Sequence, residues 1–364
     1  MILIVRSNIS LYLCNIIMEV CESMKIVALF TKDENSQYDN QLLSEANALG
    51  LKDFLDEDDE LVTVESNEEL DDHLEDVEVI ISSPFLPLYV TRERIEKAPK
   101  LKLSITAGVG SDHVDLKAAD EHDIAVVEVT GSNQVSTAEH AVLNIIVLVR
   151  NFQEGNRQAR EGEWDLSKLG NRAQDLEGKK VGIMGYGLIG QMVAERLAPF
   201  GVEIQHYDPA KDEDSEYSKA VSFDELIESS DIISIHTPLT ESTEGLFDKE
   251  VFQKMKDSAH LVNVSRGAIV NTEDLKEALE NDVIAGYGGD VWYPQPAPSD
   301  HPWRSLPETR NSMTPHYGGM TIDAQKRIQD GVHELLTNYK NGEEFDPKHV
   351  IVGPEGLSDS YTVE

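Results

Sequence analysis

An arginine, a glutamine and a histidine stand in three short runs of the chain where their side chains could bind a small anion. Arg266 follows the apolar run LVNVS and precedes Gly267, a pattern typical of a loop at the end of a buried strand. Its planar guanidinium matches the two oxygens of a carboxylate. Gln295 lies within a run that contains four prolines, and His316 follows Pro315. These residues predict a carboxylate site; the alternatives are a surface ion pair for the arginine and a core position for the histidine.

A glycine-rich turn predicts a dinucleotide site. Gly185, Gly187 and Gly190 form GxGxxG between the apolar run VGIM and the helical run LIGQMVAERLAPF. Such glycines let the backbone approach a pyrophosphate, whose charge the helix N-terminus favours. Asp208 ends the next apolar run, where a carboxylate can accept from both ribose hydroxyls. Because that carboxylate would repel a 2′-phosphate, the pattern predicts NAD rather than NADP; an aspartate that only caps a turn is the alternative.

Apolar runs alternate with amphipathic stretches from Met24 onward, which predicts parallel sheets with helices on their faces. The longest helical pattern, residues 136–162, is expected to be a helix that connects two domains. Helices are also expected at residues 66–77, 92–100 and after His316. Strands are expected at residues 25–30, 61–64, 77–83, 101–107, 124–129, 181–187, 202–208, 231–238, 260–267 and 284–292.

The fold class that follows is α/β, with two doubly wound, Rossmann-like parallel-sheet domains and an active-site cleft between them. We expect residues 24–136 and 317–364 to form a discontinuous substrate domain, and residues 137–316 to form the NAD-binding Rossmann domain. Residues 1–23 are apolar and contain both cysteines, Cys14 and Cys21. We interpret this segment either as a doubtful extension, with translation starting at Met24, or as a packed part of the fold.

The chain is strongly acidic, with 68 Asp and Glu against 31 Lys and Arg and a net charge of -37 over 364 residues. The acids are spread along the chain, and there is no basic patch, so a nucleic-acid partner is not expected. At molar salt such a charge is screened and keeps the surface hydrated, which favours a halophilic source. The apolar N-terminal run is too interrupted to span a membrane, and we expect a cytoplasmic protein without a membrane partner.

Several longer runs resemble NAD-dependent formate dehydrogenases, which belong to the D-2-hydroxyacid dehydrogenase superfamily. The resemblance extends from Met24 to about Pro354. The runs that carry it are TAGVGSDHVDL, EVTGSN, AEHAV, LVRNF, LVNVSRGAI, GYGGDVWYPQPAPSDHPWR and MTPHY. It implies direct hydride transfer from formate to NAD⁺ without a metal, and a homodimer formed through the NAD-binding domain.

The resemblance also implies the residues of the site. Phe85 and Val109 would form the substrate wall, and Asn133 would donate its amide to the carboxylate, beside Arg266, Gln295 and His316. The sequence departs from the usual family pattern at Val109, at Leu188 in the glycine turn and at Gly318. The implied cofactor contacts are Gly185, Gly187, Leu188, Ile189, Gly190, Asp208, Thr237, Pro238, Leu239, Ser242, Val264, Ser265, Arg266, Asp290, His316, Gly318 and Gly319.

Three further residues complete this interpretation. Asp290 is expected to accept from the nicotinamide carboxamide, with a structural loop aspartate as the alternative. His113 and His140 are interpreted as structural. No cluster of His, Cys or carboxylates has metal-ligand spacing, and hydride transfer needs no metal.

Gln295 occupies the place of a glutamate in the general superfamily site, 29 residues after Arg266. In a hydroxyacid dehydrogenase that glutamate raises the pKa of the histidine, which must take a proton from a hydroxyl. Formate has no hydroxyl to deprotonate. A neutral glutamine can therefore hold His316 without adding a negative charge beside an anion, and the prolines would keep it on a stiff, extended loop.

Two rival functions remain open at this point. A D-2-hydroxyacid dehydrogenase or glyoxylate reductase would need the histidine to move a proton, which Gln295 disfavours. A non-enzymatic NAD-binding regulator of the same fold would have no use for Asn133, Arg266, Gln295 and His316 together. Assays with glyoxylate and with formate would separate these alternatives.

Overall fold

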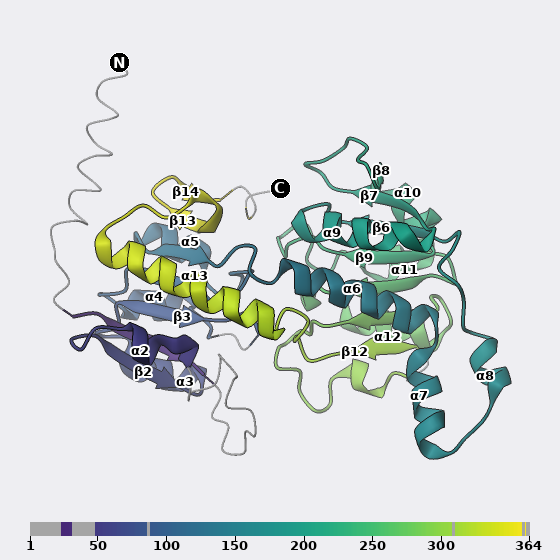
Figure 1. The fold of residues 1–364 in the computed structure, drawn as a ribbon, viewed down its shortest axis with the longest axis horizontal. Helices are drawn as coiled ribbons and strands as arrows, with labels where there is room; N and C mark the ends of the chain where they lie inside the picture. The colour runs from purple at the N-terminus through teal and green to yellow at the C-terminus, as the bar shows by residue number, and fades with distance from the viewer. Residues whose placement is uncertain (1–22, 31–47, 86–87, 308–309, 359–360, 362–364) are drawn as a thin grey trace. The chain divides into compact units, whose positions relative to one another are not determined.

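The protein is described here by a computed structural model that covers residues 23–30, 48–85, 88–307, 310–358 and 361. The described residues of Met1–Ser132 and Ile322–Asp359 form one compact unit, and those of Asn133–Thr321 form the body of a second. Each unit contains one seven-stranded sheet (Figure 1). The expected α/β class is confirmed. The hypothesis about residues 1–23 concerns a segment of which only Ser23 lies within the described residues.

The sheet of the first unit has the strand order β14-β13-β5-β4-β3-β1-β2. Five parallel strands coincide with apolar runs expected from the sequence: β1 Lys25–Leu29, β2 Glu60–Val64, β3 Val79–Ser82, β4 Leu103–Thr106 and β5 Ala125–Glu128. The sequence analysis did not anticipate β13 Val350–Gly353 and β14 Gly356–Leu357, which extend the sheet in antiparallel pairing. β14 has only two residues, too few to show a period, whereas β13 is an apolar run as long as β3 that the sequence analysis left unassigned.

The sheet of the second unit has the order β12-β11-β10-β9-β6-β7-β8, and all its strand pairs are parallel. The strands β9, β10 and β11 are buried along their whole length, as expected for a parallel sheet with both faces covered. The bounds are β6 Lys180–Met184, β7 Glu203–Tyr207, β8 Lys219–Ala220, β9 Ile232–Ile235, β10 His260–Asn263, β11 Gly286–Gly289 and β12 Asn311–Met313.

Helices cover both faces of this second sheet. Figure 1 shows α6 (Gln134–Val149) and α9 (Leu188–Leu197) side by side over the strands, and their apolar faces share one core with β6. The core on the other side includes α10 (Phe223–Ser229), α11 (Lys249–Lys254) and α12 (Thr272–Glu280). Because the sheet is enclosed in this way, ligand-binding residues are expected at the carboxyl ends of its strands.

The helix α13 (Ile322–Asn341) packs on the sheet of the first unit and is the longest of the helices described there. Its residues Ile328, Val332, Leu335 and Leu336 are fully buried against the strands of that unit, so the amphipathic pattern after His316 forms the expected helix. The described residues of this unit also form α2 Leu51–Phe54, α3 Asn67–Leu70, α4 Arg92–Lys97 and α5 Leu116–Glu121. Short 3-10 helices are η1 Ala48–Gly50, η2 Asp71–His73, η3 Ala198–Phe200, η4 Gly267–Ile269, η5 Pro302–Ser305 and η6 Pro347–His349.

The prediction of one continuous helix over residues 136–162 is wrong. The segment forms α6 and a separate helix α7 (Phe152–Glu161), followed by α8 (Leu166–Gly170). Asn151 breaks the helix because its φ of 51° lies in the left-handed region. The apolar periodicity continues across the break, so the pattern alone did not reveal it. The longest helix among the described residues is α13, not this segment.

Candidate active site

The structure brings Gln295 and His316 together. The Nδ1 of His316 lies 2.8 Å from the Oε1 of Gln295. Because an amide oxygen can only accept, this contact places a proton on Nδ1 and leaves Nε2 to face other groups. The glutamine thus orients the imidazole without placing a charge beside it. The backbone of His316 has a φ of 55°, a left-handed conformation that non-glycine residues adopt only where the surroundings enforce it.

The loop that carries His316 is held by a buried carboxylate. Asp290 is 3% exposed and follows β11. Its Oδ1 accepts from the Thr314 hydroxyl at 2.6 Å and from the Tyr317 N–H at 3.0 Å, and its Oδ2 accepts from the Gly318 N–H at 2.6 Å. Asp290 therefore fixes the residues on both sides of His316. Its expected role as acceptor for the nicotinamide carboxamide stays a prediction.

The proline-containing run that carries Gln295 is fixed by aromatic and arginine side chains. Trp292 donates its Nε1–H to the Thr314 carbonyl at 2.8 Å, which links the run to the loop of His316. Arg304 donates to the carbonyls of Pro298 and Ala297 at 2.8 and 2.9 Å, and its guanidinium lies 5.2 Å from the centre of the Trp292 ring. Arg304, the last residue of the run, thus donates to the carbonyls of the loop that contains Gln295 and holds that loop in place.

Arg266 follows β10, the central strand of three buried neighbours, at their carboxyl end. The Asn263 side chain donates to the backbone carbonyl of Arg266 at 2.8 Å. Arg266 in turn donates an Nη1–H to the Ser265 carbonyl at 2.8 Å. The next residue, Gly267, packs directly on the loop of Gln295: a Cβ there would overlap the Trp292 carbonyl and lie 2.8 Å from the backbone nitrogen of Tyr293. Close packing thus connects the arginine loop to the glutamine loop.

Asn133 is the residue that precedes α6: its backbone carbonyl accepts from the Thr137 N–H at 2.9 Å, but its side chain does not cap the helix. It is 6% exposed, and its side chain makes no hydrogen bond to the part of the chain that the structure describes. An enclosed amide of this kind is available to a ligand. Its role as a donor to the substrate carboxylate stays a prediction.

The two wall residues, Phe85 and Val109, belong to the first unit, in loops that follow the neighbouring strands β3 and β4. The two loops pack together there, because a Cβ at Gly108 would lie 3.0 Å from Pro84 and 3.4 Å from the Phe85 ring. The positive φ of 142° at Gly108 also favours glycine. The first unit therefore provides one apolar surface from two strand ends.

The glycine turn after β6 is closely packed on one side and open on the other. Gly185 has a φ of 86°, and a Cβ on it would lie 2.6 Å from the Thr237 nitrogen. A Cβ on Gly190 would overlap the Gly185 carbonyl. At Gly187, by contrast, a Cβ would meet no atom within 4 Å. Two glycines are thus required by packing, whereas the third keeps the backbone open at the N-terminus of α9, where an anion would bind.

Asp208 follows β7 and faces the same turn. Its Oδ2 accepts from the Tyr186 N–H at 2.7 Å and its Oδ1 from the Ala210 N–H at 2.9 Å. A carboxylate has about four acceptor positions, so further positions remain for ribose hydroxyls. A hollow of about 510 Å³ opens beside it, and its lining includes Asp212, Lys211 and Glu225. The residues present fit the adenosine end of NAD.

The other expected cofactor contacts lie at strand ends of the same unit. Leu188 is 59% exposed at the first position of α9, and Ile189 packs partly against the core. Thr237, Pro238, Leu239 and Ser242 follow β9, and the Thr237 carbonyl accepts from the Ser265 hydroxyl, next to Val264. Gly318 and Gly319 are buried after His316. Position 318 accommodates no larger side chain without a shift, since a Cβ would lie 2.7 Å from the His140 ring.

Sequence reasoning missed the side chains that support these residues, chiefly Thr314, Trp292 and Arg304. Trp292 and Arg304 belong to the long run around Gln295, and Thr314 to the run that contains His316, but the partners of these side chains depend on tertiary contacts. Within the described ranges, no group of three or more His, Cys, Asp or Glu could hold a metal ion. None of the helices in these ranges combines the length and the hydropathy that a membrane span needs.

Replacing Asp208 with serine should raise turnover with NADP⁺ and lower catalytic efficiency with NAD⁺. The change removes repulsion of a 2′-phosphate and hydrogen bonds to the ribose, each worth about 1.5–3 kcal/mol when charged. Initial rates with both cofactors test this. Asp208→Asn is the matched control, because it removes the charge and keeps one acceptor for the Tyr186 N–H. If the ratio of NAD⁺ to NADP⁺ efficiency stays the same in both variants, Asp208 does not select the cofactor.

Known proteins resemble this chain over most of its length. A family model described as the D-isomer specific 2-hydroxyacid dehydrogenase NAD binding domain matches residues 142–318. The mitochondrial formate dehydrogenase of Solanum tuberosum is 45% identical over 350 residues, 93% of this chain and 91% of its own. The formate dehydrogenase of Neurospora crassa is 45% identical over 333 residues, 86% and 89% of the two chains. The solved structure of the NAD-dependent formate dehydrogenase of Staphylococcus aureus in complex with NAD is 60% identical, with a TM-score of 0.88 over 91% of this chain and 99% of that one.

Proposed function

The chain belongs to the NAD-dependent formate dehydrogenases of the D-2-hydroxyacid dehydrogenase superfamily, and we propose that Asn133, Arg266, Gln295 and His316 carry its reaction. The reaction converts HCOO⁻ and NAD⁺ to CO₂ and NADH. NAD⁺, when bound, supplies the acceptor for the hydride. The C–H bond of formate breaks, its electron pair leaves with the hydrogen, and no proton has to be removed from the substrate.

The side chains of the protein then have to bind and orient an anion. The Arg266 guanidinium offers two parallel N–H donors to the two formate oxygens, and Asn133 offers a further amide donor. These donors hold formate so that its hydrogen is directed at the acceptor. His316 faces the substrate with Nε2, because Nδ1 is engaged by Gln295.

The single observation that carries this proposal is the 2.8 Å contact between His316 and a neutral glutamine. A glutamate there would prepare the histidine for proton transfer, whereas glutamine orients it only. The test is NADH formation from formate and NADH consumption with glyoxylate, both from low to molar salt. Rapid formate oxidation with slow glyoxylate reduction is expected; the reverse preference would assign the protein to the hydroxyacid dehydrogenases.

We propose that the enzyme works in the cytoplasm of a halophile, at molar salt. The net charge of -37 supports this, and so does the pairing of single basic side chains with several carboxylates. Several bases each meet two or more carboxylates, so local negative charge remains after pairing. Examples are Arg157 with Glu154, Glu161 and Glu163; Lys340 with Asp56 and Asp59; Lys25 with Glu60 and Asp76; and Arg92 with Asp115 and Glu121.

Lowering the salt concentration from molar to tenths of molar should therefore lower both activity and melting temperature, with partial recovery when salt is restored. The Debye length lengthens from about 3 Å to about 10 Å over this range, so unpaired carboxylates begin to repel one another. Formate turnover and thermal unfolding, followed across the salt series, check this. Full activity and stability at low salt would reject the halophilic assignment.

We propose that a second copy of the chain binds at an arm formed by α7, α8 and their connection, residues 152–170. The arm projects from the rest of its unit (Figure 1). Phe152, Trp164 and Leu166 are 58%, 84% and 66% exposed, and Leu143 of the preceding helix is 49% exposed. So many exposed apolar side chains on one continuous segment support a protein interface.

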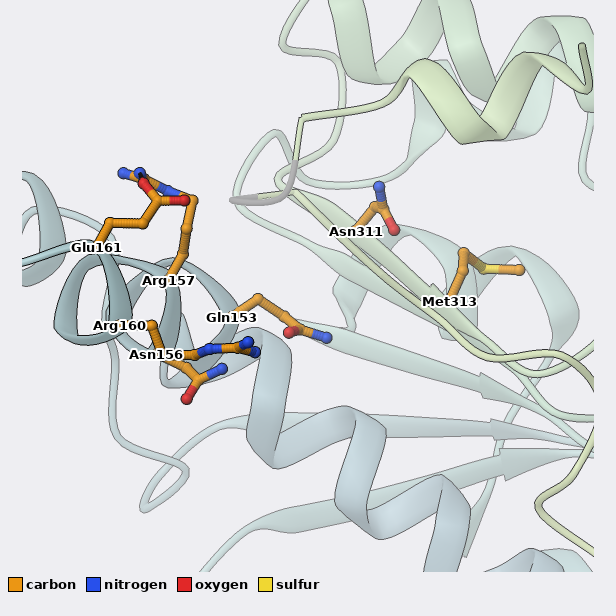
Figure 2. Close-up of a pocket in the computed structure, with 7 residues that line it drawn as sticks. All are labelled: Gln153, Asn156, Arg157, Arg160, Glu161, Asn311 and Met313. Carbon is orange, nitrogen blue, oxygen red and sulfur yellow. Dashed lines mark hydrogen bonds and ion pairs between the residues drawn. The ribbon is translucent and has the colours of Figure 1, made fainter. Parts of the chain in front are cut away.

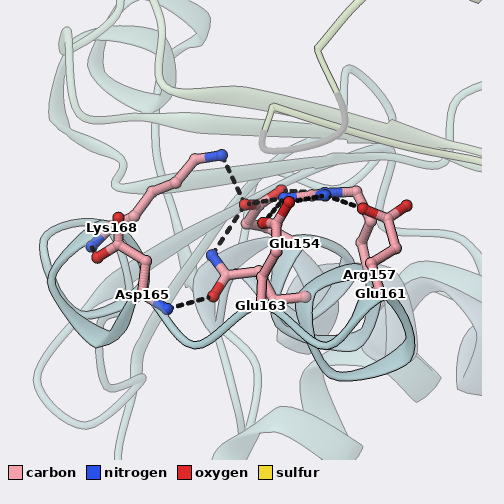
Figure 3. Close-up of polar contacts among 7 residues, drawn as sticks. Glu154, Arg157, Glu161, Glu163, Asp165 and Lys168 are labelled. Atoms are coloured by element: carbon pink, nitrogen blue, oxygen red, sulfur yellow. Dashed lines mark hydrogen bonds and ion pairs between the residues drawn. The ribbon is translucent and has the colours of Figure 1, made fainter.

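The arm is braced internally by a buried carboxylate, which supports a preformed binding surface. Glu154 has a side chain that is 3% exposed and accepts from Arg157, Gln158 and Lys168 (Figure 3). Hydrogen bonds from these groups hold the pKa of the Glu154 carboxyl well below its usual range. Their stabilising contribution is thus present above the usual carboxyl pKa and is lost as the pH falls through the depressed value.

Beside the arm lies a hollow of about 580 Å³, which offers polar contacts next to the apolar ones. Figure 2 shows α7 side chains on one side of it, including Gln153, Asn156 and Arg160, and Asn311 and Met313 of β12 on the other. An apolar centre with a polar rim is the usual composition of an interface.

Replacing Trp164 with aspartate should convert a dimer to a monomer, because the change puts a charge at the most exposed apolar position of the arm. Size-exclusion chromatography with light scattering at molar salt measures the mass. Ile322→Asp is the matched control, since Ile322 is equally exposed, at 84%, but lies in the first unit. Equal masses for wild type and Trp164→Asp would exclude the arm as the interface.

A further inference from the structure

We propose that His140 is a positioning residue for His316, acting through the Thr314 hydroxyl and the Asp290 carboxylate. The proposal rests on the role of His316 in the proposed function and extends it to a residue that does not touch the substrate. His140 lies on α6 and is 6% exposed, and its Nε2 lies 3.0 Å from the Thr314 Oγ1.

The distances determine which group donates in each of the hydrogen bonds that join His140, Thr314 and Asp290. Thr314 Oγ1 lies 2.6 Å from Asp290 Oδ1 and 3.2 Å from the Gly289 carbonyl. The hydroxyl must donate to Asp290, since two oxygens without a proton between them would repel at the shorter distance. The Thr314 oxygen is then left as an acceptor, and His140 must provide the N–H. His140 therefore selects the rotamer in which Thr314 bonds the carboxylate.

The His140 ring is also constrained in position. It meets the Tyr317 ring edge to face, with centres 5.0 Å apart and planes at 77°. Burial lowers the pKa of His140, although Asp290, 3.6 Å away, opposes the shift. A neutral imidazole carries one N–H, and the Thr314 contact places it on Nε2. The ring thus packs on one residue of the His316 loop and donates to another.

The consequence for His316 is a fixed backbone. Asp290 binds Thr314 before His316 and the N–H groups of Tyr317 and Gly318 after it. His316 keeps a left-handed φ of 55° between these anchors. If Thr314 no longer donates to Oδ1, the Asp290 carboxylate keeps only its bonds to the Tyr317 and Gly318 N–H groups. It then loses its anchor before His316, and the loop can relax toward a more usual conformation. The imidazole would then move away from Gln295 and from the substrate position.

Two pairs of variants test this proposal, each with one variant that removes a hydrogen bond and one that keeps it. Thr314→Val removes the hydroxyl at nearly constant shape, and Thr314→Ser retains it. His140→Phe removes the N–H and keeps a ring, and His140→Gln retains a donor near the Nε2 position. The measurements are kcat and KM for formate at saturating NAD⁺, and the NMR resonances of isotope-labelled histidine, with the His316 signal assigned by its loss in His316→Asn.

We expect Thr314→Val and His140→Phe to lower kcat/KM for formate by about tenfold or more and to shift the His316 resonance, while Thr314→Ser and His140→Gln stay within about threefold. The proposal is overturned if the valine and phenylalanine variants keep both the rate and the resonance, or if the serine and glutamine variants lose as much. The NMR readout needs no formate turnover. A wild-type protein inactive on formate would therefore refute the proposed function and leave this inference to be decided by the resonance.

Discussion

Replacing Arg266 with alanine lowers kcat/KM for formate by about 10²–10⁴-fold, while the protein remains folded. The loss follows from two charge-assisted hydrogen bonds to the substrate oxygens, each worth about 1.5–3 kcal/mol, where about 1.4 kcal/mol is tenfold. Steady-state kinetics at molar salt, together with thermal unfolding, measures the effect and shows whether the fold is retained.

The comparison variants for this prediction separate charge from geometry. Arg266→Lys keeps the charge but not the planar fork, so its activity is expected between those of alanine and wild type. Arg92→Ala removes a guanidinium that pairs with Asp115 and Glu121 in the first unit, and it should leave kcat/KM unchanged. Equal activities of wild type and Arg266→Ala would show that another group binds the carboxylate.

Replacing Gln295 with glutamate gives opposite changes in two assays on one protein. The new carboxylate raises the pKa of His316 across the 2.8 Å contact and puts a negative charge near the substrate anion. Formate oxidation should fall by about tenfold or more, because the substrate binds less well. Glyoxylate reduction, which needs a proton delivered as hydride arrives, should hold steady or increase. Rates with both substrates over about pH 5 to 9 measure the two effects.

Gln295→Met is the matched control, since it keeps the length of the side chain, removes the hydrogen bond to His316 and introduces no charge. It should lower both activities, because the imidazole loses its orientation, without the gain toward glyoxylate. Unchanged rates and pH profiles in Gln295→Glu would show that the glutamine does not set the type of reaction.

Much of the fold followed from local patterns in the sequence. Buried parallel strands appear as short apolar runs, so β3, β4, β9 and β10 were recognisable from residue type alone. The interruption between α6 and α7 at Asn151 was not recognisable from the sequence, because a single left-handed residue leaves the apolar period intact on both sides. The antiparallel pairing of β13 with β5 was also missed, since it joins segments more than two hundred residues apart.

In the candidate site, too, some residues could be predicted from the sequence and others could not. The glutamine and the histidine could be paired from motifs because their chemistry depends on residue type. The groups that position them could not, because Thr314, Asp290 and His140 meet only after three separate elements have packed. His140 in particular was interpreted as structural, and only its contact with Thr314 connects it to His316. A lone histidine on an apolar helix face carries no signal of what it touches.

The most direct test of the central claim is the fate of deuterium from deuterated formate, measured by NMR or mass spectrometry of the reduced cofactor at molar salt. Direct hydride transfer, with Arg266 holding the carboxylate and His316 held by Gln295, predicts one deuterium at C4 of each NADH formed. It also predicts a matching release of CO₂ and a slower rate than with ordinary formate. NADH that carries no deuterium, or no NADH from formate while glyoxylate is reduced, would contradict the account.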